Sequence, residues 1–207
     1  MTIRHFVHRH TRFSRVRPFF CAIALPTPNC YFVPIEKNAC TTIKSNIFFA
    51  IHNREHEGDI HQYWDSRADC FHLWCVSLKT FALIRDPLTR FISGYRDLVL
   101  YRSEGRALFP NEEPDVEFFL ANFDSFLQIP MFKSHFQMQA EYLRPDTKLY
   151  RFNELEKFQS DFGLRISNSS NVSKKVGIKP HEMRLIKSFI DGKYKEDINI
   201  FENIKSK

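Results

Sequence analysis

The sequence lacks several features that mark common classes of protein. Its short apolar run, Pro18 to Leu25, is far below the ~20 residues that a membrane-spanning helix needs, so no integral membrane segment is expected. The 5 cysteines form no C-x-x-C pair and no zinc-ligand spacing, and no metal site is predicted. Their odd number argues against a secreted disulfide scaffold and fits a reducing compartment.

Glycine is scarce, with 6 residues in a chain of 207, and none lies between residues 31 and 44. The Walker A pattern G-x-x-x-x-G-K-[ST] is absent, which argues against a nucleotide kinase of the P-loop type. No carboxylate suited to magnesium stands out either. Internal repeats and low-complexity tracts are also absent, so a repeat protein is not expected.

The composition that is present is typical of one globular domain. The chain is 43% hydrophobic and 26% charged, and its 22 phenylalanines predict a phenylalanine-rich core. The net charge of +6 suits an anionic cofactor or a polyanionic partner. The first 20 residues are basic and aromatic. We therefore expect a basic N-terminal arm over residues 1–29 and one folded domain over residues 30–207.

A candidate anion site lies at Tyr31 to Lys44, which reads YFVPIEKNACTTIK. Apolar residues predict a short strand, a polar loop follows, and helical spacing of apolar residues begins at Thr41. The first N–H groups of a helix lack internal partners and its dipole favours negative charge, so such a joint suits phosphate or sulfate. Lys37 lies in the loop, and Thr41 and Thr42 add hydroxyl donors. The alternative is an ordinary strand–loop–helix joint with a threonine cap.

A second candidate site lies at Lys79 to Arg96, which reads KTFALIRDPLTRFISGYR. Phe81 to Ile84 is a short buried-strand run, and Pro87 fits the first turn of a following helix. Arg85 therefore falls at the C-terminal end of a strand, where open α/β sheets bind their ligands. Ser93 lies two turns into the helix. A guanidinium group and a hydroxyl are good partners for a terminal phosphate.

Both segments resemble motifs of the sulfotransferases that use 3′-phosphoadenosine 5′-phosphosulfate (PAPS). The first is similar to their 5′-phosphosulfate loop, and the second to their 3′-phosphate motif, R-[DN]-P-x-x-R-x-x-S-x-Y. The resemblance is closest to carbohydrate sulfotransferases that modify chondroitin, dermatan or heparan, and to their small bacterial relatives. It extends over residues 30 to 203 and includes His135 and Gln139. One departure is Glu36, which directly precedes the loop lysine where the family usually has proline.

The alternation of strands and helices predicts an α/β fold with a central parallel sheet. The resemblance implies the sulfotransferase version of the P-loop nucleotide-binding fold. It also implies PAPS as the donor and a carbohydrate hydroxyl as the acceptor. Lys37 would stabilise the leaving 5′-phosphate, while Arg85 and Ser93 would bind the 3′-phosphate. The donor-binding residues of the loop would be Lys37, Asn38, Ala39, Cys40, Thr41 and Thr42.

Sulfuryl transfer also needs a base for the acceptor proton. A neutral histidine suits this role, because its unperturbed pKa lies near working pH. Family members place the base between the two motifs, so we predict His61 as the base, followed by His52 and His56. Tyr63 and Trp64 beside it could form a wall for a sugar or belong to the core. The candidates in or beside this segment are His52, His56, His61 and His72.

The second half of the chain predicts further helices and one strand. A helix over residues 132–143 would place His135 and Gln139 on one face, either toward a ligand or as a polar surface stripe. A polar loop over residues 163–180 carries Lys174 and Lys175, which could contact donor phosphates or solvent. The other predicted elements are a strand at 148–152 and helices at 155–162, 181–190 and 194–204.

The predicted function is therefore transfer of a sulfuryl group from PAPS to a carbohydrate, by a cytoplasmic protein or one peripheral to a membrane. The membrane anchor of animal relatives is not found, and no nucleic-acid partner is expected. Two alternatives stay open. One is another phosphate-binding enzyme such as a nucleotide kinase, and the other is a non-catalytic basic module that binds a polyanion.

Overall fold

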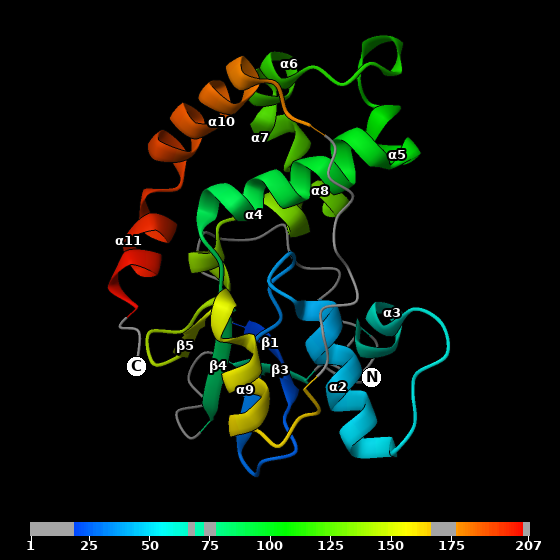
Figure 1. Ribbon diagram of the computed structural model, residues 1–207, viewed down its shortest axis with the longest axis vertical. Helices are drawn as coiled ribbons and strands as arrows, with labels where there is room; N and C mark the ends of the chain where they lie inside the picture. Colours follow the sequence, from blue (N-terminus) through cyan, green and yellow to red (C-terminus); the bar gives the residue numbers. More distant parts are fainter. Residues whose placement is uncertain (1–18, 66–68, 73–77, 167–176, 205–207) are drawn as a thin grey trace. The chain divides into compact units, whose positions relative to one another are not determined.

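The computed structural model describes residues 19–65, 69–72, 78–166 and 177–204. This part of the chain forms two compact units (Figure 1). Unit 1 takes its described residues from 19–35, 39–83 and 142–166, and unit 2 from 36–38, 84–141 and 177–204. The chain passes between the units several times, so each of the two sequence motifs is divided between them.

Unit 1 is built on a five-stranded sheet with the order β3-β1-β2-β4-β5. β2 and β4 pair in parallel, with Phe32 opposite Phe81, whereas β1 runs antiparallel to both β2 and β3. The α/β class is confirmed. The sheet is mixed, because the short turn between β1 and β2 permits only antiparallel pairing. The strands are β1 (Phe19–Ala24), β2 (Cys30–Phe32), β3 (Asp69–His72), β4 (Lys79–Ile84) and β5 (Lys148–Arg151).

The first strand lies inside the range that we expected to be the N-terminal arm. Ala22 and Ile23 are 0% and 1% exposed, and Ile23 pairs with Phe32 of β2. The sheet therefore begins before residue 30. The boundary that we expected at residue 30 is too late, because β1 already begins at Phe19. The apolar run was too short to stand out beside the basic residues before it. Residues 1–18 lie outside the described part of the chain.

The helices of unit 1 are α2 (Cys40–His52), α3 (Ile60–Asp65), the 3-10 turn η4 (Phe152–Glu154) and α9 (Leu155–Asp161). Helix α2 buries Ile43 and Ile47 in one core with Phe32 and Phe158. The rings of Phe32 and Phe158 meet edge to face, with their centroids 5.7 Å apart. This core fixes α2, and with it the helix N-terminus of the predicted anion site, on the sheet of unit 1 (Figure 1).

The described part of unit 2 is helical and has its own core. Phe91 lies at the centre of this core and contacts the rings of Phe119, Phe123 and Phe136. The predicted phenylalanine-rich core is thus present. The elements are α4 (Pro87–Gly94), η1 (Tyr95–Tyr101), α5 (Ser103–Arg106), η2 (Pro110–Glu112), α6 (Val116–Ala121), α7 (Phe123–Phe126), α8 (Pro130–Phe136), η3 (Gln139–Tyr142), α10 (Pro180–Lys193) and α11 (Lys195–Asn203).

The predicted helix over residues 132–143 is wrong in its second half. Helix α8 ends at Phe136, and Gln137 turns to an extended conformation with φ −58° and ψ 142°. Gln139 then begins a separate 3-10 turn, so it does not share a helical face with His135. The two terminal helices, by contrast, appear as α10 and α11. None of the helices in the described ranges is long and apolar enough to cross a membrane.

Candidate functional site

The loop that was predicted to bind an anion has an unusual backbone. Lys37 and Ala39 have φ values of 68° and 58°, although neither is glycine. Left-handed conformations of this kind cost free energy in residues with a Cβ atom and concentrate at functional sites. Ala39 is the N-cap of α2 and makes no side-chain cap. The threonine-cap alternative is therefore wrong: Thr41 and Thr42 lie inside the first turn of the helix.

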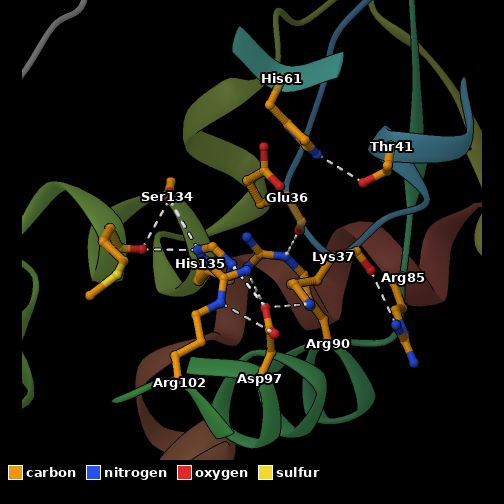
Figure 2. A network of polar contacts seen from close by, with 11 residues as sticks. Glu36, Lys37, Thr41, His61, Arg85, Arg90, Asp97, Arg102, Ser134 and His135 are labelled. Atoms are coloured by element: carbon orange, nitrogen blue, oxygen red, sulfur yellow. Dashed lines mark hydrogen bonds and ion pairs between the residues drawn. The ribbon is translucent and has the colours of Figure 1, made fainter. Parts of the chain in front are cut away.

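The side chain of Lys37 forms an ion pair within unit 2. Its Nζ lies 3.0 Å from Oδ2 of Asp97, and the lysine side chain is 17% exposed. Arg102 donates to the same carboxylate, with Nη2 3.0 Å from Oδ2, and Nε2 of His135 lies 3.5 Å from it. Figure 2 shows the carboxylate between these three side chains. Lys37 is thus held by a carboxylate that two other basic groups also contact.

These contacts keep Asp97 ionised. Burial alone would raise its pKa, but the hydrogen bond from His135 and the charges of Lys37 and Arg102 outweigh burial. The pKa of Asp97 is therefore well below its ordinary value. On the other side of His135, Nδ1 lies 2.9 Å from the carbonyl oxygen of Met131, which can only accept, so Nδ1 carries a proton.

The arginine that begins the second motif reaches the loop of the first. Nη1 of Arg85 donates to the carbonyl oxygen of Lys37 at 3.1 Å, and Nε donates to Oγ1 of Thr89 at 3.3 Å. Burial lowers the pKa of Arg85, and nearby Arg90 adds to this shift while Asp86 opposes it. The structure therefore brings together Lys37 and Arg85, two of the residues that were predicted to bind the donor.

Helix α4 follows Arg85 as the sequence predicted. Asp86 is its N-cap and accepts from the N–H of Thr89 at 2.8 Å, and Pro87 occupies the first turn. Ser93 lies on this helix and is 7% exposed. A local cap and a proline are enough to fix where the helix starts. They therefore also fix where Ser93 falls on α4.

Two buried residues hold the loop in place, and sequence reasoning gave this role to neither of them. Arg90 is 2% exposed, and it donates to the carbonyl oxygens of Glu36 at 3.0 Å and Gln137 at 2.9 Å. Gln139 is 0% exposed and accepts from Nδ2 of Asn38 at 2.6 Å. The pattern R-[DN]-P-x-x-R contains Arg90, and it was the one available signal for this role.

Gln139 also connects the loop to Arg85. Its Oε1 accepts from the backbone N–H of Arg85 at 3.1 Å, and its Nε2 donates to the carbonyl oxygen of Arg85 at 2.9 Å. The backbone of Gln139 is in turn held by Asp197 of α11, which accepts from the N–H groups of Gln139 and Ala140 at 2.8 and 2.9 Å. Asp197 is 0% exposed. A short polar chain therefore runs from α11 to both predicted phosphate-binding segments of unit 2.

His61, the predicted base, lies in unit 1 on α3. Its Nδ1 lies 3.1 Å from Nζ of Lys44, and its Nε2 lies 2.9 Å from Oγ1 of Thr41 (Figure 2 shows the second contact). A lysine ammonium can only donate, so Nδ1 accepts and Nε2 carries the proton that is donated to Thr41. His61 is thus placed beside Thr41 at the start of α2, but both of its ring nitrogens are engaged.

The other histidines of unit 1 have different surroundings. Nε2 of His52 lies 2.9 Å from the hydroxyl of Tyr63 in an exposed contact, and His56 packs edge to face on Phe48. Trp64 is 6% exposed and donates to the carbonyl oxygen of Lys44, so it belongs to the core. The side chains of His72, Lys174 and Lys175 lie outside the described part of the structure.

A comparison with protein families identifies the class. Residues 23–162 match the sequence profile of the sulfotransferase family, which is more than half of the chain. The chain therefore belongs to the sulfotransferase family, whose members transfer sulfuryl groups. Neither curated proteins nor solved structures gave a match. The matched range contains both predicted phosphate-binding motifs, His61 and the cluster of Asp97 with Lys37, Arg102 and His135.

Proposed function

We propose that this sulfotransferase transfers a sulfuryl group from PAPS to a hydroxyl group of a carbohydrate. The observation that carries the proposal is the contact between Arg85 and the backbone of Lys37 at 3.1 Å in unit 2. In the family that the two motifs resemble, these residues bind the two phosphate ends of one donor molecule. The proximity of Lys37 and Arg85 supports a ligand with phosphates at both ends. A non-catalytic basic module would not need two such residues side by side.

The residues fit such a donor by their chemistry. The guanidinium of Arg85 and the hydroxyl of Ser93 suit the 3′-phosphate, because a planar fork and a hydroxyl match a terminal phosphate. The ammonium of Lys37 and the N–H groups of the loop from Asn38 to Thr42 suit the 5′-phosphosulfate. Two residues of this loop are left-handed, and such residues are typical of turns in which successive N–H groups face one anion.

The donor supplies an activated sulfuryl group. In the proposed step, the acceptor oxygen forms a bond to sulfur as the bond from sulfur to the bridging phosphate oxygen breaks. Negative charge grows on that oxygen, and Lys37 meets the charge with its ammonium group. The acceptor hydroxyl loses its proton to a base.

His61 of unit 1 is the proposed base. To act, it must exchange the hydrogen bond from Lys44, because Nδ1 needs a free lone pair to take a proton. Thr41, the partner on Nε2, holds the ring in one orientation. An oriented imidazole of this kind is a suitable base once one of its contacts is given up.

A ligand screen tests the proposed donor. The purified chain should bind adenosine 3′,5′-bisphosphate more tightly than ATP with magnesium or a heparin oligosaccharide, as measured by calorimetry. Arg85→Ala should lose the preference for 3′-phosphorylated ligands, because removing one charge-assisted contact costs about 1.5–3 kcal/mol. Arg184→Ala, at an exposed position on α10, is the matched control and should bind as wild type does.

Two outcomes would contradict this proposal. Preference for ATP with magnesium would indicate a nucleotide kinase, and preference for heparin alone would indicate a polyanion-binding module. If Arg85→Ala binds the bisphosphate as well as wild type does, the assignment of Arg85 is wrong even when the donor is right. Incubation with labelled PAPS and a panel of sulfate-free polysaccharides then identifies the acceptor class.

A further inference from the structure

We propose that Asp97 is a positioning residue that holds the ammonium group of Lys37 in the geometry needed for sulfuryl transfer. This inference rests on the proposed function, because it assumes that Lys37 meets the charge of the leaving phosphate. Neither of the two sequence motifs as described above assigns a role to Asp97.

The carboxylate of Asp97 is fixed by groups other than Lys37. Arg102 approaches it with Nη2 at 3.0 Å and Nε at 3.4 Å, and the backbone N–H of Arg102 donates to the carbonyl oxygen of Asp97 at 3.2 Å. His135 contacts it from α8 at 3.5 Å. Asp97 and Arg102 are brought together by the π-helix η1, whose C-cap is Arg102. Asp97 would therefore stay in place when Lys37 moves.

Lys37 needs such an anchor. A lysine side chain has four flexible carbon–carbon bonds and a compact charge, so its ammonium group is poorly fixed without a partner. The backbone of Lys37 is held, since its carbonyl oxygen accepts from Arg85 and its φ is 68°. Asp97 restrains the other end of the residue, at a distance of 3.0 Å. Together these contacts restrain the residue at both ends.

The cluster keeps a positive charge despite the carboxylate. Lys37 and Arg102 are two cations and Asp97 is one anion, so these three groups together keep one positive charge. An anionic donor is therefore still attracted. Without Asp97 the attraction would increase, but Lys37 would be free to adopt other rotamers. Removal of the carboxylate should thus affect binding and turnover in opposite directions.

The test is Asp97→Asn, which keeps the size of the side chain and removes its charge. We expect kcat to fall by about tenfold to a hundredfold, the cost of a misplaced catalytic group. The KM for PAPS and the dissociation constant of adenosine 3′,5′-bisphosphate should stay equal or decrease. Asp191→Asn, at an exposed position on α10, makes the same change in net charge and should leave all three quantities unchanged.

A double-mutant cycle makes the test specific. If Asp97 acts through Lys37, the variant Lys37→Ala/Asp97→Asn should be no slower than Lys37→Ala, because the second change has nothing left to position. Arg102→Gln is a milder variant for the case that Asp97→Asn does not fold. It should lower kcat, and because it also removes one positive charge from the cluster, its KM for PAPS should rise. Its target is half exposed, so the core is left intact.

Three results would overturn the inference. An unchanged or raised kcat in Asp97→Asn and Arg102→Gln would mean that the carboxylate restrains Lys37 but does not contribute to sulfuryl transfer. Additive losses in the double variant, or weaker binding of the bisphosphate in Asp97→Asn, would mean a structural role only. If the wild-type chain neither binds the bisphosphate nor consumes PAPS, the proposed function itself fails, and this result is separate from the other two.

Discussion

Lys37 and Ala39 place left-handed backbone conformations in a loop that contains no glycine. Each such residue is strained relative to glycine, and the strain is opposed by contacts that hold the loop. Arg90 binds the carbonyl oxygen of Glu36, Arg85 binds that of Lys37, and Gln139 binds the side chain of Asn38. At the scale of single residues, the loop is shaped by three buried or half-buried partners and not by its own flexibility.

The first prediction at this scale concerns His61. His61→Ala should lose activity by at least about a hundredfold, because a positioned base contributes about 10²–10⁴-fold. Its affinity for adenosine 3′,5′-bisphosphate should stay unchanged, since we propose that other residues bind the phosphates. The assay uses labelled PAPS and the acceptor found in the polysaccharide panel. His181→Ala on the exposed surface of α10 is the control.

The same assay separates His61 from its competitors. Alanine variants of His52, His56 and His72 should keep most of the activity. If one of them shows the loss and His61→Ala stays active, the mechanism remains but the residue is wrong. If no histidine matters, a carboxylate takes the proton, and Glu36 and Glu55 are the next residues to replace.

At the scale of elements, the π-helix η1 is the feature that the sequence did not predict. The apolar residues after Tyr95 are equally compatible with an α-helix, since their spacing does not distinguish i+4 from i+5 hydrogen bonding. Such π-segments are often found at functional sites. This one carries Asp97 in its first turn. Helix α4 was predictable because its signals, Asp86 and Pro87, are local.

The contacts that complete the site join positions that are far apart in the sequence. Lys37 and Asp97 are 60 residues apart, and Asn38 and Gln139 are 101 apart. No local pattern reports such pairs, so the sequence could nominate Lys37 and Arg85 but could not place Asp97, Gln139 or Asp197 beside them. The mistaken helix over residues 132–143 had the same origin: tertiary contacts of Gln139 replace helical hydrogen bonds there.

The second prediction concerns the close packing of α5 on η1. A Cβ atom on Gly105 would lie 1.7 Å from the carbonyl oxygen of Leu98, which is backbone and cannot move aside as a side chain can. Gly105→Ala should therefore separate the two elements and lower the free energy of unfolding by about 1–3 kcal/mol, as overpacking in a core does. Urea unfolding measures this change.

A matched control exists for this variant. Gly192 on α10 has nothing within 4 Å of the position of an added Cβ, so Gly192→Ala should be neutral or stabilising in a helix. Because η1 carries Asp97, Gly105→Ala should also lower kcat, while Gly192→Ala should not. Equal free energies of unfolding in the two variants would show that α5 and η1 can move apart without destabilising the fold.

At the scale of the whole molecule, the chain divides into two units with separate cores, and each unit holds part of the predicted machinery. The described residues of unit 1 supply the sheet, the start of α2 and His61, and those of unit 2 supply Lys37, Arg85 and Ser93. An α/β fold was predictable because strands and helices alternate along the chain, and its sulfotransferase version was predictable only because the two motifs resemble that family. The early start of the sheet was not, because β1 is short and follows a basic segment.

The final prediction is the pH dependence of stability, which depends on Asp97. Its pKa is lower in the folded chain than in the unfolded one, where it is about 3.9. The contribution of the ionised carboxylate is therefore fully present above the unfolded pKa and is lost as pH falls toward the folded pKa. At pH 7 the free energy of unfolding of Asp97→Asn should be about 1.5–3 kcal/mol lower than that of wild type, which is the range for hydrogen bonds to charged groups.

The difference between wild type and Asp97→Asn should be constant from pH 7 to about pH 5 and shrink below about pH 4, where the unfolded carboxylate takes up its proton. Burial raises the pKa of Asp197, although the N–H groups of Ala140 and Gln139 oppose this shift. Asp197 therefore makes the fold more stable, not less, as pH falls. Asp197 is present in both proteins, so its effect cancels in the difference. Urea unfolding at pH 7, 5, 4 and 3 measures the two curves. A difference that does not change with pH would show that the charge of Asp97 does not stabilise the fold.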